Sequence, residues 1–123
     1  MYTITNHIEP RIIEVKLDGL CSMEEFAQFC AELRVTITTF PSGPSDPATL
    51  YNFTDASIQT QEVVAAMKQL AENPAMVHRR VALYTEGALA RRQAHRISEN
   101  RPNMKVFPSR ADALIWIASG ADS

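Results

Sequence analysis

The hydrophobic and polar positions of this chain switch between two periods along its whole length. Short β-type apolar runs predict strands near residues 3–8, 11–17, 49–54, 79–85 and 104–107. Apolar residues recurring every three or four positions predict helices at about 22–39, 58–73, 87–100 and 110–119. Strands separated by helices of this length are typical of crossover units. We therefore expect one α/β domain over residues 1–123, with a mixed, mostly parallel five-stranded sheet and four helices packed mainly on one face.

Turn and capping residues support these boundaries. Pro10 lies between the first two strands, where it fits a turn and predicts an antiparallel hairpin. Ser22 with Glu25, and Ser109 with Asp112, have the spacing of a capping box, in which the serine hydroxyl accepts from an exposed helix amide. Two helix starts are thereby predicted from side-chain chemistry as well as from period.

The apolar faces predict the core. In the first helix the inward positions are Phe26, Phe29, Cys30, Leu33, Ile37 and Phe40. In the last helix they are expected to be Ala111, Leu114, Ile115 and Ala118. Trp116 lies off that face, and covering the sheet edge is its favoured role. The strand residues Phe53, Val81 and Leu83 are expected to be buried, since parallel strands are covered on both faces.

Composition indicates an ordinary globular protein, with 46% apolar and 21% charged residues. No apolar run approaches the ~18 residues of a membrane span, and no signal-peptide pattern opens the chain. Cys21 and Cys30 are placed on opposite sides of a helix, too far apart to bridge. Two reduced thiols and a cytoplasmic location are therefore expected.

Positive charge is concentrated in one part of the chain. Residues 79–110 hold eight of the twelve Lys and Arg residues but only two of the fourteen acidic ones. On the predicted helix of this segment, the residues that share an arc of about 140° are Arg91, Arg92, His95, Arg96 and Glu99. The opposite arc carries Leu89, Ala90, Gln93, Ala94 and Ile97.

An ordinary solvated helix face explains this pattern in its simplest form. Against that explanation, Arg92 and Arg96 are like charges four residues apart, a spacing that destabilises a helix. An anionic ligand or an acidic protein surface meeting Arg91, Arg92, His95 and Arg96 accounts for the cluster better.

A second candidate lies at the start of the same helix. Thr85 and Gly87 follow a buried strand, and ligands of open α/β sheets bind where strands end and helix amides are free. Asp55 and Ser57, after the preceding strand, are expected to border the same crevice. Thr85 is equally explained as a helix N-cap, and a single glycine is not a phosphate-binding loop.

Other chemistry is not indicated. His7, His78 and His95 have no metal-ligand spacing with other residues, and no catalytic or dinucleotide fingerprint is present. His95 and Glu99 are the nearest approach to a catalytic pair, although such spacing is common on helix surfaces. The acidic chain, whose basic helix has no interleaved aromatics, does not fit nucleic acid binding. No metal and no cofactor are expected, and an enzyme is the less favoured class.

The chain resembles the STAS fold of anti-sigma-factor antagonists, in the SpoIIAA-like (STAS/SEC14-like) branch of small bacterial proteins. The residues that carry the resemblance are Tyr51 to Ala56, Arg80 to Tyr84 followed by Ala88 to Arg91, and Lys105 to Phe107 before Ala111 to Trp116. The element order agrees over nearly the whole chain. The resemblance implies the fold, and most of this branch has no assigned activity.

One departure from the family concerns its regulatory serine. STAS antagonists carry a phosphorylatable serine in an Asp-Ser-Ser-Gly turn after the central strand. Here the stretch from Asp55 to Thr60 reads Asp-Ala-Ser-Ile-Gln-Thr. With no Ser-Ser pair and no glycine, neither Ser57 nor Thr60 is marked as a kinase target, and no serine switch is expected.

We therefore expect a non-enzymatic binding or regulatory module that meets a protein partner or a small anionic ligand through its basic helix surface. The alternative is a carrier of a small anionic or lipid-like ligand, or a small enzyme, using the crevice at the strand ends. An apolar cavity between the first helix and the sheet favours the alternative, whereas a flat basic face over a packed core favours the module. A homodimer is compatible with either.

Overall fold

The computed structural model describes residues 1–41, 43, 46–73, 79–99, 101 and 103–119. In chain order the elements are β1 (Tyr2–His7), β2 (Ile12–Leu17), α1 (Met23–Thr39), β3 (Ala48–Asn52), α2 (Gln61–Glu72), β4 (Val81–Tyr84), α3 (Ala88–Ser98), β5 (Met104–Phe107) and α4 (Arg110–Ser119). Each predicted strand and helix is present, with ends that differ by up to three residues. Residue 100 of the predicted third helix lies outside the described residues, as does His78.

The strands form one mixed sheet in the order β1-β2-β3-β4-β5. β1 pairs antiparallel with β2, which confirms the predicted hairpin, and the other pairings are parallel. Because β2 to β5 run in the same direction, their carboxyl ends meet at one edge of the sheet. The loops after β2, β3 and β4 therefore lie at this carboxyl edge.

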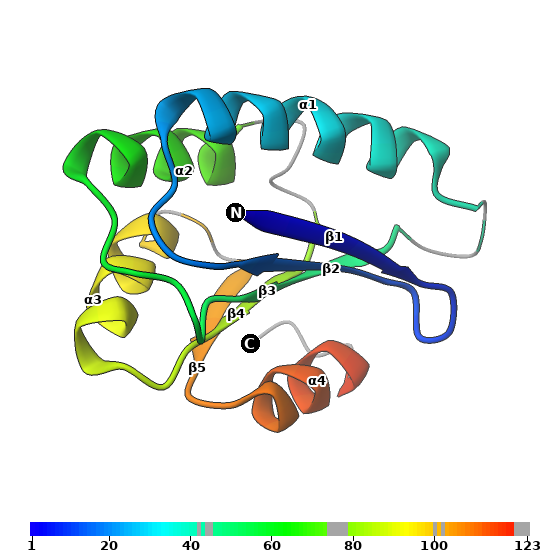
Figure 1. Ribbon diagram of the computed structural model, residues 1–123. Coiled ribbons are helices and arrows are strands. Elements are labelled where there is room, and N and C mark those ends of the chain that lie inside the picture. Colours follow the sequence, from blue (N-terminus) through cyan, green and yellow to red (C-terminus); the bar gives the residue numbers. More distant parts are fainter. Residues whose placement is uncertain (42, 44–45, 74–78, 100, 102, 120–123) are drawn as a thin grey trace.

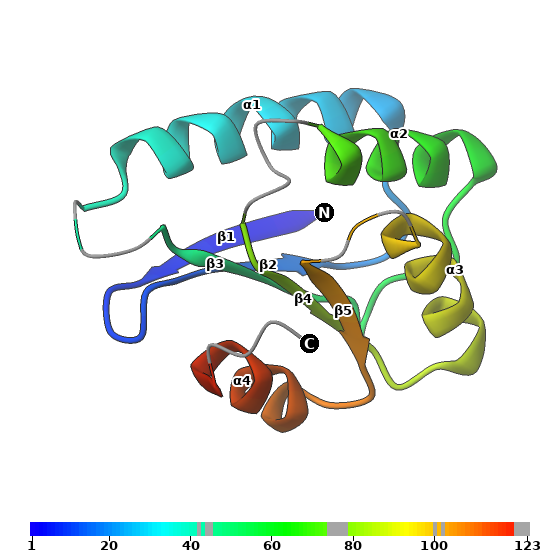
Figure 2. The ribbon, with the colours of Figure 1, turned by 180° about the vertical axis from the view of Figure 1, so that it is seen from behind.

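Helices cover the two faces unequally (Figures 1 and 2). α1, α2 and α3 lie on one face, where the larger core cluster includes Phe29, Val63 and Ile97. α4 covers the other face, where Leu50 and Ala113 belong to a smaller cluster. Three helices on one face and one on the other agree with the prediction, and Phe53, Val81 and Leu83 are buried as expected.

The predicted caps start two of these helices. The Ser22 hydroxyl accepts from the Glu25 amide at 3.0 Å, at the start of α1. The Ser109 hydroxyl accepts from the Asp112 amide at 3.2 Å, at the start of α4. Each serine satisfies a backbone donor that has no partner within its helix.

The β-branched end of α1 remains helical to Thr39. The hydroxyls of Thr36, Thr38 and Thr39 each donate to the carbonyl four residues earlier, at 2.8 to 2.9 Å. Leu33 and Phe40 are buried on the core side of this segment. Burial of the periodic apolar face therefore outweighs the weak helix propensity of the threonines.

The predicted inner face of α4 is wrong in phase. Ala113, Leu114, Trp116 and Ile117 pack on the sheet, whereas Ala111 and Ala118 are exposed and Ile115 is 68% exposed. The indole of Trp116 stacks against Phe107 with ring centroids 5.7 Å apart, and the Arg80 guanidinium lies 4.1 Å from its centre. These large contacts set the rotation of α4. Trp116 covers the edge strand β5, as expected.

Candidate functional site

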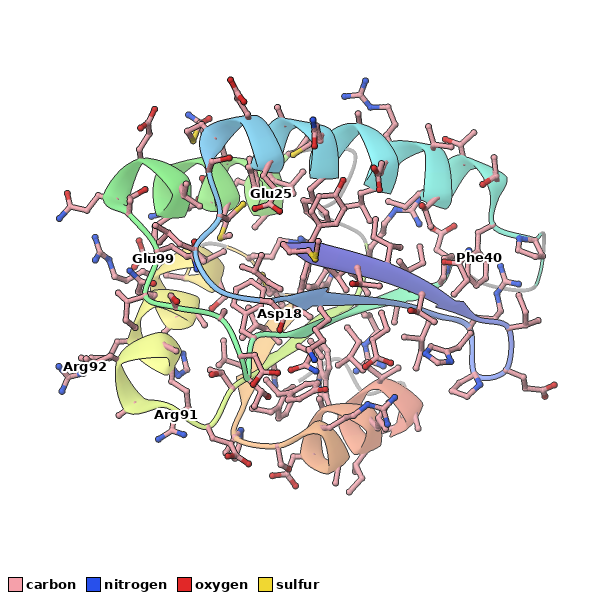
Figure 3. The ribbon with its side chains drawn as sticks, viewed as in Figure 1. Asp18, Glu25, Phe40, Arg91, Arg92 and Glu99 are labelled. Carbon is pink, nitrogen blue, oxygen red and sulfur yellow. The ribbon has the colours of Figure 1, made fainter. Side chains whose placement is uncertain are left out.

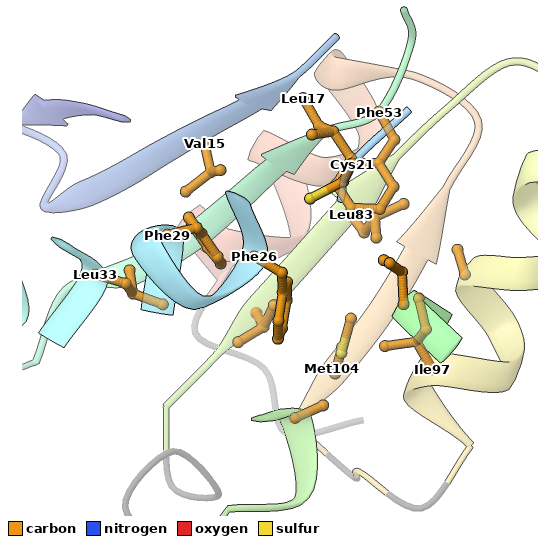
Figure 4. Close-up of a cluster of buried hydrophobic side chains, with 14 of the residues drawn as sticks. Val15, Leu17, Cys21, Phe26, Phe29, Leu33, Phe53, Leu83, Ile97 and Met104 are labelled. Atoms are coloured by element: carbon orange, nitrogen blue, oxygen red, sulfur yellow. The ribbon is translucent and has the colours of Figure 1, made fainter. Parts of the chain in front are cut away.

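A cavity of about 50 Å³ lies between the sheet and the layer of α1, α2 and α3. Its wall is apolar almost throughout, with side chains from all five strands and all three helices. Figure 4 shows several of them directed into one space, among them Phe26, Phe53, Leu83, Ile97 and Met104. A space of this size exceeds what one water molecule needs, and apolar cavities in proteins accept apolar guests.

Aromatic rings form one side of the cavity. The Tyr2 and Phe29 ring centroids are 5.3 Å apart, those of Phe29 and Tyr51 6.3 Å, and those of Tyr51 and Phe53 5.9 Å, all edge to face. Tyr51 lies on the central strand beneath the helices and still keeps intermediate solvent exposure. The cavity is therefore lined by rings in mutually favourable contact, and a central strand position is left incompletely covered.

One charged side chain borders the cavity. Arg101 is only 3% exposed, and its guanidinium donates to the carbonyl oxygens of Ala71, at 3.0 Å, and Arg79. Burial lowers the pKa of Arg101, and the neighbouring Tyr51 opposes this effect. An arginine nevertheless stays protonated in proteins. Arg101 thus ties the end of α2 to the start of β4 and brings a positive charge to the cavity wall.

The two thiols near this space are not activated. Cys21 is buried in the cavity wall and Cys30 is half-buried on α1, and both are free. Burial is the main cause that raises the pKa of each thiol above its ordinary value. A raised pKa leaves the group protonated near neutral pH, so neither cysteine has the character of a catalytic nucleophile.

The loops of the carboxyl edge are joined by one buried side chain, that of Gln59. Its amide oxygen accepts from the Cys21 N–H at 2.8 Å, and its amide nitrogen donates to the carbonyls of Gly19 and Ser57 at 3.0 and 2.6 Å. The Gln59 backbone exchanges two hydrogen bonds of 2.9 Å with the Gln93 side chain on α3. Gly19 has a φ of +69°, which favours glycine. Sequence reasoning missed Gln59, because no local motif marks it.

At the start of α3 the structure corrects one prediction. Thr85 is not the N-cap: its buried hydroxyl donates to the Phe53 carbonyl at 3.3 Å, and its N–H donates to the Phe107 carbonyl. The N-cap is Gly87, which offers no side-chain acceptor. A Cβ at Gly87 meets only ordinary contact, 3.7 Å from Ala90. Thr85 therefore extends the hydrogen bonding of β4 with β5 by one residue, and its hydroxyl bonds to the chain after β3 and does not cap the helix.

The other two crevice residues are exposed. The Asp55 carboxylate pairs with the Lys16 ammonium at 3.2 Å, and Ser57 donates its N–H to the Gly19 carbonyl. The Asp55 contact is the largest cause that raises the pKa of Lys16. Neither residue lines the cavity, and the same holds for Thr85 and Gly87. The structure thus places the four predicted crevice residues near one edge of the sheet and outside the cavity.

The basic residues of the predicted arc lie on the solvent side of α3. Arg92, His95 and Arg96 are exposed on α3, and Arg91 is half-buried with a hydrogen bond of 2.7 Å to the Glu86 carbonyl. Figure 3 shows the Arg91 and Arg92 side chains pointing outward. Within the described ranges, none of the three arginines pairs with a carboxylate.

Glu99, the acid of the predicted arc, forms an ion pair with Lys68 of α2. Its charge is therefore shared with Lys68 and does not compensate the arginines on its own. That contact, ahead of weaker attraction to Arg96, lowers the pKa of Glu99. Ala94 and Ile97 are buried as predicted, but Leu89 is 62% exposed and its assignment to the inner arc is wrong. The first turn of α3, where Ala88 and Leu89 are both exposed, is not covered by the sheet.

A polar cluster that the sequence did not indicate lies on the α4 face. The Glu14 carboxylate accepts from the His7 ring at 2.9 Å and from Arg110 at 2.9 Å. The Arg110 contact is the largest cause that lowers the pKa of Glu14.

Across the part of the chain that is described, no three His, Cys, Asp or Glu side chains gather as metal ligands do. Among the described helices, none has the length and apolar character needed to cross a bilayer.

Comparisons with known proteins support the fold and leave the activity open. No protein-family model matches the chain, and no curated protein does. Among solved structures, an uncharacterized protein of the DUF3478 family from Shewanella loihica PV-4, described as having a SpoIIAA-like fold, superposes with a TM-score of 0.68. The identity is 18%, and the match covers 94% of this chain and 91% of that chain. The chain therefore has the SpoIIAA-like fold, as the sequence predicted.

Proposed function

We propose that this protein binds a small, mainly apolar ligand in the cavity between the sheet and α1, α2 and α3, as a carrier or ligand-responsive module without catalytic activity. The cavity carries this proposal. It is lined by aromatic and aliphatic side chains and lies between the first helix and the sheet. An apolar cavity at this place favours a ligand carrier over a module with a fully packed core. The protonated thiols of Cys21 and Cys30 give no support to a catalytic reading.

The size of the cavity limits the ligand. About 50 Å³ is roughly a third of the ~150 Å³ apolar cavity known to bind benzene, so only a body of a few carbon atoms fits without movement of the walls. A longer chain requires the side chains of Met67 and Leu70 on α2, which are only half-buried, to give way. Methionine adapts readily to such changes because it is unbranched and has low torsional barriers.

Native mass spectrometry of the protein purified from the cells that make it tests this proposal. We expect an adduct that is released on denaturation and can be identified in an organic extract. Ala71→Leu, which adds bulk to the cavity wall, should reduce the adduct, whereas Ala111→Leu, on the exposed side of α4, should not. As a second measurement, the melting temperature is followed during a titration with benzene and with indole. A ligand at 100 times its Kd stabilises the folded state by about 2.7 kcal/mol and therefore raises the melting temperature. The proposal is wrong if no adduct is found and neither compound raises the melting temperature.

A second candidate function is supported by a separate observation. We propose as the alternative a binding or regulatory module that meets an anionic partner through Arg91, Arg92, His95 and Arg96. The absence of carboxylate partners for the three arginines within the described residues supports it, since clustered like charges are a standing cost that a counter-charge relieves.

Charge reversal tests this alternative. Arg92→Glu combined with Arg96→Glu should leave the circular dichroism spectrum unchanged, because both side chains are exposed, and should abolish binding to partners recovered from cells. Arg34→Glu, on the exposed side of α1, is the control. Binding by the wild type should also weaken as salt rises, because exposed charges are screened over about 8–10 Å. A double variant that binds every partner normally contradicts the idea.

A further inference from the structure

Three large apolar side chains are exposed at the carboxyl edge of the sheet. Leu20, Ile58 and Leu89 are 57%, 46% and 62% exposed. They come from the loop after β2, the loop after β3 and the first turn of α3. Single exposed apolar residues are common on protein surfaces, whereas several at one edge of the fold point to a contact surface.

The hydrogen bonds of Gln59 bring these three residues to the same edge. Leu20 lies between Gly19 and Cys21, both of which bond to the Gln59 side chain. Ile58 precedes Gln59 directly, and Leu89 lies one helical turn before Gln93, which bonds to the Gln59 backbone. The apolar side chains are therefore held on a preorganised framework, which reduces the entropy lost when a partner binds.

Charge flanks the apolar residues on one side. Arg92 and Arg96 follow Leu89 by three and seven positions and so lie along the same side of α3. On the other side, Asp18 and Asp55 are paired with Lys16, at 3.8 and 3.2 Å. Lys16 is one cation shared by two carboxylates, whereas Arg92 and Arg96 have no carboxylate partner within the described residues, so unpaired positive charge borders the apolar residues on the α3 side.

We propose that Leu20, Ile58, Leu89, Arg92 and Arg96 form one docking surface for an acidic amphipathic segment of a partner protein. Its apolar side chains contact the leucines and the isoleucine, and its carboxylates pair with the arginines. This inference rests on the second candidate function, to which it adds an apolar centre and a partner of defined chemistry.

The surroundings favour a protein over an anionic membrane. The exposed acids Glu62, Glu86 and Asp55 lie at the same edge, at the start of α2 and in the loops after β4 and β3. A broad negative lipid surface meets these acids together with the arginines, so repulsion by the acids offsets the attraction of the arginines. A peptide segment is narrow enough to meet the apolar residues and the arginines alone. Helical segments with an apolar stripe and a charged flank are a common form of such partners.

Site-specific photo-crosslinking in the native cells tests the proposal. A benzophenone amino acid replaces Leu89, or Arg92, or Ile115 on α4 as the control. We expect crosslinks from positions 89 and 92 to the same protein and none from position 115. The crosslinked peptide, sequenced by mass spectrometry, should be acidic and amphipathic. A synthetic copy of this peptide should bind the Leu89→Ser and Ile58→Ser variants at least about tenfold more weakly than the wild type, as expected for apolar side chains central to an interface. It should bind the Ile115→Ser variant with unchanged affinity.

The outcomes separate the two levels of the argument. Crosslinks from position 92 without any from position 89, or full affinity in the Leu89→Ser and Ile58→Ser variants, refute the apolar docking surface and leave the basic module standing. Crosslinks to lipid, to a second copy of this chain or to a basic segment refute the partner class. No crosslink from either position refutes both.

Discussion

Truncation of Leu83 to alanine is the sharpest test of the packing on which the cavity depends. Leu83 is 1% exposed on β4, which pairs with β3 on one side and β5 on the other, and its side chain lines the cavity. The change removes three carbon atoms from the wall and enlarges a space that is already present. The strands on either side are held by backbone hydrogen bonds, so they cannot collapse into the gap.

The expected loss of unfolding free energy is about 2–5 kcal/mol, the sum of lost transfer energy and the enlarged cavity. We expect a value in the lower half of this range, because one side of Leu83 already borders empty space and makes fewer contacts there. Leu50, fully buried on the α4 face, does not line this cavity. Leu50→Ala should therefore cost more than Leu83→Ala.

Equilibrium urea unfolding measures these differences, with an unchanged m-value as the sign that the denatured state is not altered. Ile115→Ala is the control, because Ile115 is a large apolar residue of α4 that the structure leaves exposed. It should change stability by no more than about 0.5 kcal/mol. A loss below about 1 kcal/mol for Leu83→Ala, or one equal to that of Ile115→Ala, refutes the central, cavity-lining position of β4.

Three further predictions concern the carboxyl edge and the polar cluster. Gln59→Ala should cost about 1–3 kcal/mol in urea unfolding, because the Cys21 amide loses its buried partner; an unchanged midpoint contradicts this. The lowered pKa of Glu14 means that its stabilisation is present above its unfolded pKa of about 4.3 and is lost as pH falls below it. Unfolding curves of wild type and Glu14→Gln should therefore differ at neutral pH and converge in acid, and a constant difference refutes the role of Arg110. Phosphoproteomics should find no stoichiometric modification of Ser57 or Thr60, and a phosphate there overturns the missing switch.

The fold could be predicted because burial leaves a regular trace in the sequence. The four apolar residues of β4 and the periodic face of α1 each follow from being covered by neighbours. The phase of α4 could not be predicted, because apolar residues occupy more than one of its sides. Contacts of Trp116 with Phe107 and Arg80 choose among these sides, and they join segments far apart in the chain.

The candidate sites were predictable to the extent that they lie on one element. The exposed arginines of α3 follow from helical period alone. Leu89 was assigned to the wrong side because its exposure depends on where α3 extends past the sheet, which period does not encode. The cavity needs side chains from five strands and three helices, and Arg101 is buried only because the end of α2 meets the start of β4. No local pattern contains this information.

The loop after β3 connects the fold to the proposed role of the carboxyl edge. In STAS antagonists, which this chain resembles, an Asp-Ser-Ser-Gly turn at this place presents a serine for phosphorylation. Here Gln59 occupies the segment and fastens it to the loop after β2 and to α3. A kinase needs an accessible, adaptable substrate segment, whereas a docking surface gains from a fixed one, because less conformational entropy is lost on binding. In the proposed docking surface, this arrangement would present Ile58 on a fixed support.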